Sequence, residues 1–229
     1  MNKLALDSEG VEAVRESALE SGILERDVLL CRIVASLGHI RGRKRFQKAM
    51  YIAKALGYTV PEEFAWGNYG VYSPELQWEL DSLAKHGLVL ERNVAGIGQS
   101  PEYEYALGTD GLRLLDKQRT LAAKSDEFDS PLVEGSNPVA TFGNNEIEAL
   151  VGFLRTLIGH PVNDLELWSS ILYLRQSEGN MENLISFLRY LKPKYSAEDI
   201  RQGIAEVQEL QTRSFQNLRD SRSGGPQLR

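Results

Sequence analysis

The side chains that most often carry catalysis are sparse in this chain of 229 residues. A nucleophilic serine or cysteine needs a base within reach, and the usual base would be His39, His86 or His160. None of the three lies in a recognisable catalytic signature, and each sits where a helix end or a turn is expected. The single cysteine, Cys31, and three separated histidines also lack the ligand spacing of a zinc site. The sequence therefore indicates no catalytic residue, metal site or cofactor, and it predicts a protein that is not an enzyme.

A cluster of positive charge could bind an anion. The segment RGRKRFQK, residues 41–48, holds five cations and no acid, and it falls at the start of a predicted helix. Backbone N–H groups at a helix start favour negative charge. The alternative is that these long side chains are solvated while their stems cover apolar surface. The candidate contacts to a phosphate or an acidic partner, called the basic cluster below, are Arg41, Arg43, Lys44, Arg45 and Lys48.

Aromatic side chains gather in the stretch WGNYGVYSPELQWELDSLAKHGLV, residues 66–89. Tyrosine and tryptophan combine an apolar ring with a polar group, which makes them frequent anchors of protein interfaces. The alternative is that each ring packs between a loop and its neighbouring helices. We interpret the stretch first as a fold-forming motif, second as a docking surface and third as a DNA reader. The candidates for the protein interface are Trp66, Tyr69, Tyr72 and Trp78.

The elements that would position these residues predict a winged-helix-like domain over residues 27–120. Apolar residues recur at helical spacing in RDVLLCRIVASLG and in RGRKRFQKAMYIAKALGY. Ser73 is a good N-cap and Pro74 suits the first position of the next helix. The segments LVLER and YEYAL then predict a two-stranded hairpin around the turn VAGIGQSPE, and a closing helix follows it.

Further segments flank this domain. The fold class is predicted to be mainly α with a small β-hairpin, with a helical region added after the winged-helix-like domain. The segment before residue 141 holds two prolines and no helical period, whereas four stretches after it have apolar residues at helix spacing. The predicted segments are an N-terminal amphipathic helix at 1–26, a linker at 121–140, a C-terminal helical region at 141–212 and a flexible tail at 213–229.

Composition narrows the classes of function. The formal net charge of −6 removes the simplest case for nucleic-acid binding, which is a strongly basic domain. No apolar run approaches the roughly 18–20 residues that a membrane span requires, and the acidic, amphipathic N-terminal residues are unlike a secretory signal. A cytoplasmic location without membrane contact is therefore predicted. Cys31, in LLCRIVASL, is expected to be a small apolar core residue rather than a reactive thiol.

Charge also bears on DNA reading by the predicted helix at residues 74–86. A winged helix commonly inserts this helix into the major groove. Here it carries Glu75, Glu79 and Asp81 against the single base Lys85. A repulsion of about 1 kcal/mol from each acid would offset what a few surface cations contribute. Direct insertion is therefore disfavoured, although the basic cluster could still follow a nucleic-acid backbone without sequence selectivity.

Several blocks resemble a known family. GRKRFQKAMYIAKALG, WGNYGVYSPELQWELDSLAKHGLV and LELWSSILYLR with LKPKYSAEDIRQGIAEVQEL resemble the YwgA-like family of small prokaryotic proteins and, more distantly, the SocA-like (Panacea) antitoxin domain. The resemblance implies a winged-helix-like fold with an added helical region, and SocA-like domains are associated with toxin neutralisation or protease adaptation. The pattern Tyr-Gly-x-Tyr-Ser-x-Glu-Leu is met by Tyr69, Gly70, Tyr72, Ser73, Glu75 and Leu76, with Val71 in place of the usual proline.

These observations predict a non-enzymatic regulatory or adaptor protein that acts through protein–protein contacts on a winged-helix scaffold, and the resemblance adds an antitoxin-like role. A protein partner is therefore expected. The alternative is a DNA-binding transcriptional regulator or a subunit that binds nucleic acid nonspecifically through the basic cluster. The sequence leaves the partner and the oligomeric state open.

Overall fold

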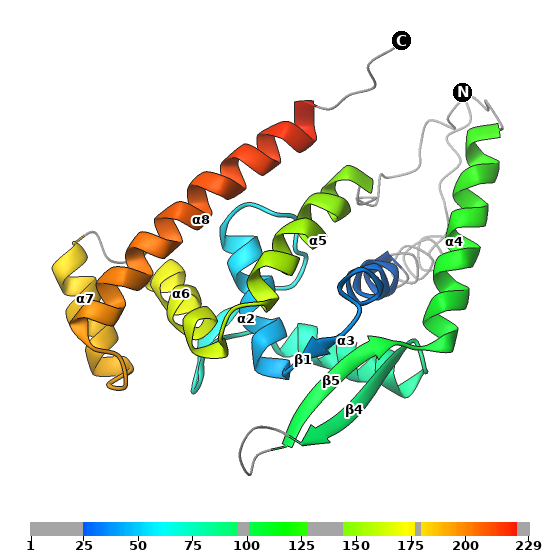
Figure 1. Ribbon diagram of the computed structural model, residues 1–229. Coiled ribbons are helices and arrows are strands. Elements are labelled where there is room, and N and C mark those ends of the chain that lie inside the picture. The colour runs from blue at the N-terminus through cyan, green and yellow to red at the C-terminus, as the bar shows by residue number, and fades with distance from the viewer. Residues whose placement is uncertain (1–24, 96–100, 128–143, 177–179, 224–229) are drawn as a thin grey trace, which may run out of the picture.

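The computed structural model describes residues 25–95, 101–127, 144–176 and 180–223. It is mainly helical with small antiparallel sheets, which confirms the predicted fold class at that level (Figure 1). The predicted helix at 1–26 falls almost wholly on residues 1–24, which lie outside the described residues. Within the ranges given above, no helix is long and apolar enough to cross a bilayer.

A helix over residues 25–37 and α2 (Arg43–Ala55) form the centre of the first half. Cys31 is fully buried, and burial raises the pKa of its thiol to about 12, so the predicted core role is confirmed. The helix predicted from residue 41 begins later, at Arg43. Gly42 precedes it with a φ of 89°, a left-handed conformation that glycine adopts without strain.

A three-stranded sheet stands beside these helices. Its order is β1 (Ile40–Arg41), β5 (Pro101–Leu107) and β4 (Val89–Ala95), with antiparallel neighbours. The predicted hairpin strands LVLER and YEYAL therefore extend further toward their turn. β1 has no counterpart among the predicted elements, because two residues are too few to show an alternating pattern.

A second, two-stranded sheet also differs from the prediction. β2 (Ala65–Gly67) pairs with β3 (Gly70–Tyr72), so the expected loop is a tight hairpin. It leads into α3 (Pro74–Lys85), whose start is as predicted, because the Ser73 hydroxyl accepts a hydrogen bond from the Leu76 amide at 3.1 Å. The aromatic stretch is thus a hairpin followed by a capped helix.

Two of the later helices, α4 and α8, run beyond their predicted bounds. After α4 (Thr109–Glu127), which runs into the predicted linker, come α5 (Asn144–Ile158), α6 (Val162–Leu174), α7 (Met181–Leu191) and α8 (Ala197–Ser223). The flexible tail predicted from residue 213 is therefore wrong as far as Ser223. Ser214 is buried and Leu218 packs against the core, so the inward-facing stripe of α8 continues at steps of four residues.

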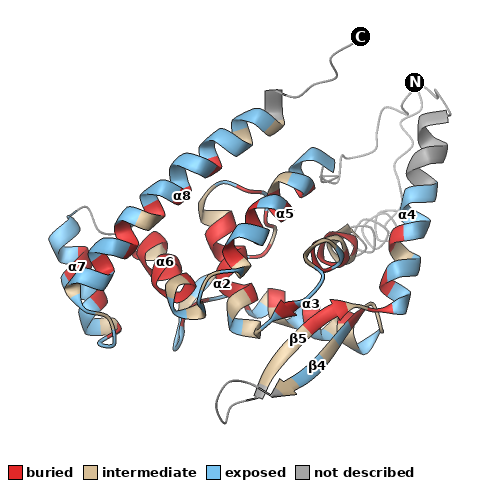
Figure 2. Ribbon diagram, viewed as in Figure 1, coloured by how far each residue is buried: buried red, intermediate tan, exposed pale blue. Residues whose placement is uncertain are grey.

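α6 connects the elements that precede α5 with the helices that follow it. It lies between α2 and α8, and most of its residues are buried (Figure 2). α8 approaches closely at Gly203, where an added Cβ would come within 2.9 Å of Leu167 Cδ2. One hydrophobic cluster accordingly contains residues of α2 and of α5 to α8. The predicted winged-helix-like domain and C-terminal helical region thus share a core.

Candidate functional site

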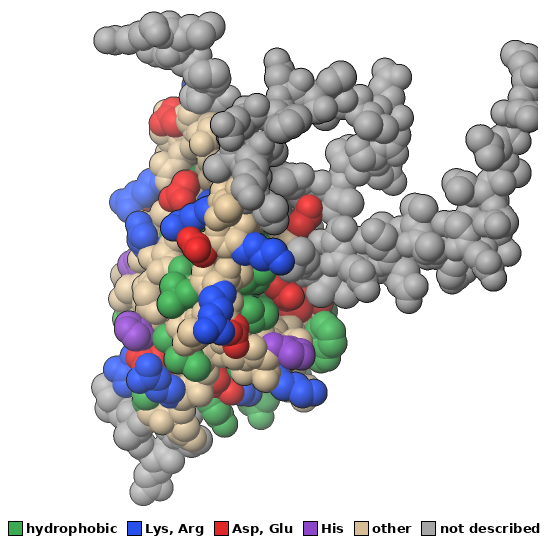
Figure 3. Space-filling view, turned by 90° about the vertical axis from the view of Figure 1, so that its right-hand side faces the viewer, with side chains coloured by type: hydrophobic (Ala, Val, Ile, Leu, Met, Phe, Trp, Pro, Cys, Tyr) green, Lys and Arg blue, Asp and Glu red, His purple; other side chains and the backbone are tan. Residues whose placement is uncertain are grey.

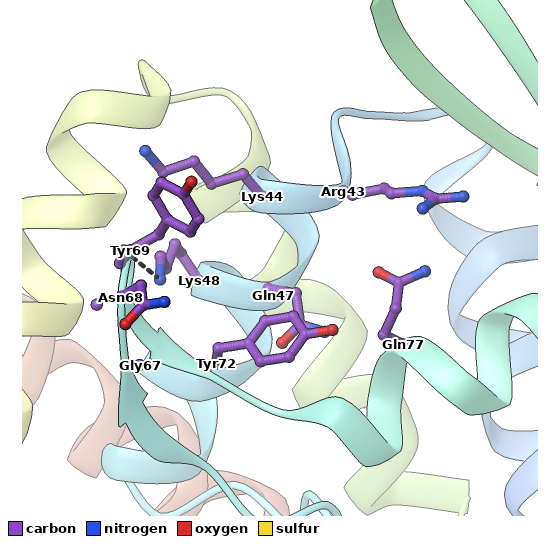
Figure 4. A pocket seen from close by; sticks show the side chains of 10 residues that line it. Arg43, Lys44, Gln47, Lys48, Gly67, Asn68, Tyr69, Tyr72 and Gln77 are labelled. Carbon is purple, nitrogen blue, oxygen red and sulfur yellow. Dashed lines mark hydrogen bonds between the residues drawn. The ribbon is translucent and has the colours of Figure 1, made fainter.

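A pocket of about 450 Å³ opens between α2, the β2–β3 turn and the start of α3 (Figure 4). It is lined by three members of the basic cluster and two of the predicted interface aromatics, together with Gln77 and the turn at residues 67–70. We call it the aromatic–lysine pocket. Its lining includes Arg43, Lys44, Lys48, Tyr69, Tyr72 and Gln77.

The four predicted interface aromatics separate into two kinds. Tyr69 and Trp78 are largely exposed, at 82% and 68%, and Tyr72 is partly exposed. Trp66 instead packs against Tyr173 of α6, with ring centroids 5.6 Å apart. The pocket brings Tyr69 and Tyr72 together, whereas Trp66 and Trp78 do not line it. The core-packing alternative therefore applies to Trp66 alone among the four.

Arg43 is held by the sheet. Its guanidinium bonds to Glu91 at 2.6 Å and 2.9 Å, approaches Asp81 at 3.6 Å and lies 4.0 Å from the centre of the Tyr103 ring. Figure 4 shows this side chain directed away from Tyr69 and Lys44. Arg43 thus borders the pocket while its charge is engaged elsewhere.

Two other arginines of the basic cluster also have internal partners. Arg45 donates hydrogen bonds to the carbonyl oxygens of Ile158 and His160, at the end of α5 and in the connection to α6. Arg41 lies in β1, with its guanidinium 3.8 Å from Glu102. These contacts tie α2 and β1 to neighbouring elements, and neither residue lines the pocket.

Glu166 of α6 pairs with three lysines at the site. Its carboxylate is nearly buried and accepts hydrogen bonds from Lys192 at 2.7 Å, from Lys194 at 3.2 Å and from Lys44. Burial alone would raise the pKa of Glu166, but the hydrogen bonds from Lys192 and Lys44 outweigh it and lower the pKa to about 2. From the sequence this residue is merely an acid near a helix start, so its role here was missed.

Lys48 is the most enclosed member of the basic cluster. Only 3% of it is exposed, and its ammonium group donates to the carbonyl oxygens of Val71 and Tyr69. Figure 4 shows the bond to Tyr69. Burial, together with the nearby charges of Lys192 and Lys44, lowers the pKa of Lys48 to about 8. The group remains mostly charged at neutral pH, and carbonyl dipoles rather than a carboxylate bind it.

The β2–β3 turn approaches these lysines through Gly70. Its φ is 88°, and an added Cβ would lie 3.2 Å from Lys192 Nζ and 3.6 Å from Lys48 Nζ. A larger residue would therefore be strained by its backbone conformation and crowded by two ammonium groups. The glycine of the Tyr-Gly-x-Tyr pattern thus serves close packing of the turn on the lysines.

A second cluster of buried ionisable side chains is formed by Glu79, on the inner face of α3, and Glu62. Glu62 is fully buried and Glu79 is 5% exposed, and their carboxyl groups are close enough for the charge of Glu62 to raise the pKa of Glu79. Burial and the neighbouring Glu62 raise the pKa of Glu79 to about 7, and burial also raises that of Glu62. Arg26 bonds to Glu79 at 3.0 Å and to Glu75 at 2.7 Å.

This arrangement corrects the charge assigned to the exposed face of α3. Glu79 faces inward and Glu75 is paired with Arg26, so neither acts as a free surface charge. Asp81 and Lys85 remain exposed. The premise that three acids would repel a polyanion is therefore wrong for Glu79 and weakened for Glu75.

The histidines occupy helix ends and turns. His86 ends α3, with its Nδ1 2.8 Å from the Ser82 carbonyl oxygen, and the ring of His160 packs edge-on against Trp168. In the part of the chain that the structure describes, no three His, Cys, Asp or Glu side chains are grouped to hold a metal ion.

Comparison with known proteins gives one informative likeness. No family model matches the sequence. The chain is similar to the uncharacterized protein YwgA of Bacillus subtilis (strain 168), with 26% identity over 188 residues, which span 82% of this chain and 98% of that protein. The likeness supports the resemblance to a YwgA-like family. It does not extend to the SocA-like domain, so that relation stays a prediction.

Proposed function

We propose that this YwgA-like chain is a non-enzymatic regulatory or adaptor protein that docks a protein partner at the aromatic–lysine pocket. The observation that carries the proposal is the convergence of Tyr69, Tyr72, Lys44 and Lys48 on one pocket of about 450 Å³. Two residue sets that the sequence separates thus border the same space. Toxin neutralisation, which the SocA-like resemblance implies, is one form that such docking could take.

The exposure of Tyr69 favours a protein partner. Its ring is 82% exposed, so the core gains little from it. A tyrosine has few rotatable bonds for its contact area and carries a hydroxyl, so it is efficient as an interface anchor. A pocket beside such a ring supplies the depth in which a partner side chain can be desolvated. The order of helices and the β1–β5–β4 sheet support a winged-helix-like scaffold for this surface.

Tyr69→Ala is expected to lower partner capture by about tenfold or more, which is the effect of losing an interface anchor. The measurement is quantitative mass spectrometry of proteins crosslinked to the tagged full chain in a lysate of its source organism. Tyr190→Ala is the matched control, because Tyr190 is 81% exposed but lies on α7, away from the pocket. Proteins lost with the first variant and retained with the second support the proposal. Equal recovery with both variants would exclude it.

DNA binding is a second candidate, and one observation favours it. Because Glu79 is buried and Glu75 is paired with Arg26, the exposed face of α3 is less acidic than the sequence indicates. Gln77 and Lys85 on that helix are side-chain types that read or approach nucleic acid. One observation disfavours DNA binding. On the side of the molecule where α4 lies, the described residues show acidic and basic side chains interspersed rather than one basic surface (Figure 3).

The DNA candidate predicts a duplex motif enriched from a random library at physiological salt. Affinity for that motif, measured by gel shift, should fall with salt, and Lys85→Gln should reduce the salt slope by about 1, as loss of a single phosphate contact does. Lys117→Gln, on α4, is the control. Without an enriched motif, α3 does not read DNA.

A further inference from the structure

We infer that the aromatic–lysine pocket recognises an acidic peptide segment of the partner, with an apolar side chain in the pocket and an adjoining carboxylate paired with Lys44. This rests on the proposed function and specifies the chemistry of the partner. The class of ligand follows from the charge around the pocket, from the exposure of that charge and from the nature of the lining.

Positive charge exceeds negative charge in the wall of the pocket and in the ion-pair cluster behind it. Lys44, Lys192 and Lys194 all form ion pairs with the same acid, Glu166. Lys48 lies close enough to feel the charges of Lys44 and Lys192, yet carbonyl oxygens bind its ammonium group. One carboxylate thus pairs with three ammonium groups, while the fourth, that of Lys48, has only carbonyl oxygens as partners among the bonds described. Like charges held together disfavour one another, so an added anion is stabilised there.

Part of this charge is accessible to a ligand. The side chain of Lys44 is 45% exposed and borders the pocket, whereas that of Lys192 is 9% exposed. Lys44 can therefore meet a carboxylate directly while the buried ammonium groups act through their field. Glu166 holds Lys44 in place before binding, which lowers the entropy lost when a partner arrives.

The lining argues against a bare anion. The rings of Tyr69 and Tyr72 and the side-chain stems of Lys44 and Gln47 face the pocket (Figure 4). A volume of about 450 Å³ lies within the roughly 300–1,000 Å³ typical of ligand pockets. An inorganic phosphate would leave most of the apolar lining in contact with water. A peptide that carries an apolar residue beside an acid covers both features.

Fluorescence anisotropy with the full chain and dye-labelled short peptides tests this chemistry. A peptide centred on Glu-Phe-Glu is expected to bind about tenfold more tightly than its Gln-Phe-Gln and Glu-Ala-Glu counterparts, because each lacks one of the two matched features. Its affinity should also fall as salt is raised from 50 to 300 mM, since the Debye length shortens by roughly 60%. Equal binding of the acidic and amide peptides, or no binding up to millimolar concentrations, overturns the inference.

Two variants assign the contact. Lys44→Met is expected to weaken the Glu-Phe-Glu peptide several-fold and to fold normally, because Glu166 keeps Lys192 and Lys194. Lys85→Met, outside the pocket, should leave binding unchanged. Competition by inorganic phosphate as effective as by unlabelled peptide would show a simple anion site and contradict the inference.

The same variants separate the two proposals. Partner capture that is lost with Tyr69→Ala but unaffected by Lys44→Met would retain the docking function and reject the acidic ligand. Peptide binding that depends on Lys44 and on both acids, with partner capture unaffected by Tyr69→Ala, would retain the ligand chemistry and reject the pocket as the docking site.

Discussion

Glu166→Gln is expected to lower the free energy of unfolding by about 3 kcal/mol, measured by urea denaturation at pH 7, because it leaves a buried ammonium group without its counter-charge. The expected effect is large because the ammonium group that loses its partner, that of Lys192, is nearly buried. Its side chain is 9% exposed and bonds to Glu166 at 2.7 Å. Glu63→Gln is the control. It removes the acid of an ion pair with Lys54 in which Glu63 is 85% exposed, and it should cost less than about 1 kcal/mol.

The pH dependence gives a second measurement on the same variant. The pKa of Glu166 lies at about 2 in the folded chain against an ordinary 4.5. A depressed carboxyl pKa contributes stability that is present above pH 4.5 and is lost as pH falls toward 2. The Glu166→Gln variant should therefore lose less stability than the wild-type chain as pH falls from 4.5 toward 2, because it lacks the carboxylate that is protonated in this range. A cost no greater than that of Glu63→Gln would contradict the role of Glu166, and Lys192→Met added to Glu166→Gln should recover part of the stability.

Glu62→Gln is expected to raise the free energy of unfolding at pH 8 by about 2 kcal/mol. The pKa of Glu79 is raised from 4.5 to about 7, so the folded chain binds more protons than the unfolded chain between these values. Stability supplied by the protonated pair is therefore present below pH 4.5 and is lost as pH rises through 7. The substitution removes the buried charge that raises the pKa of Glu79, and it supplies an amide N–H group that can donate to the Glu79 carboxylate at every pH.

The comparison runs from pH 4 to pH 8 with urea or thermal unfolding as the readout. The wild-type chain should lose stability across this range relative to Glu62→Gln, whose profile should be flatter. Glu63→Gln changes the adjacent exposed acid and should leave the profile of the wild-type chain. Parallel profiles for all three proteins would mean that Glu62 does not raise the pKa of Glu79.

Most elements could be predicted because their signals, such as helix caps and apolar periodicity, depend on residues that are close together in the sequence. Ser73 with Pro74 marks the start of α3, and its hydroxyl bond to Leu76 confirms the cap. β1 was missed because Ile40 and Arg41 become a strand only by pairing with Tyr105 and Glu104 of β5. Such pairing depends on residues distant along the chain, which no short pattern reports.

The sequence predicted many of the residues of the candidate site, but it did not predict the contacts between them. Spacing placed Tyr69, Tyr72 and the basic cluster on separate segments, and the structure brings members of both sets to one pocket. Glu166 gave no signal, because an acid in the first turns of α6 is explained by the helix dipole alone. The burial of Glu79 could not be predicted from the sequence either, because its neighbours Glu62 and Arg26 belong to other segments.

The position of α6 has a consequence for how the chain can be divided. α2 is buried on nearly every side, and α6 supplies both an apolar wall and the acid that neutralises Lys44. A fragment cut after α4 would lack α6, so it would expose the apolar face of α2 to water and leave Lys44 without Glu166. The part of the chain up to α4 and the part from α5 onward are therefore expected to fold together, and neither is expected to be stable alone.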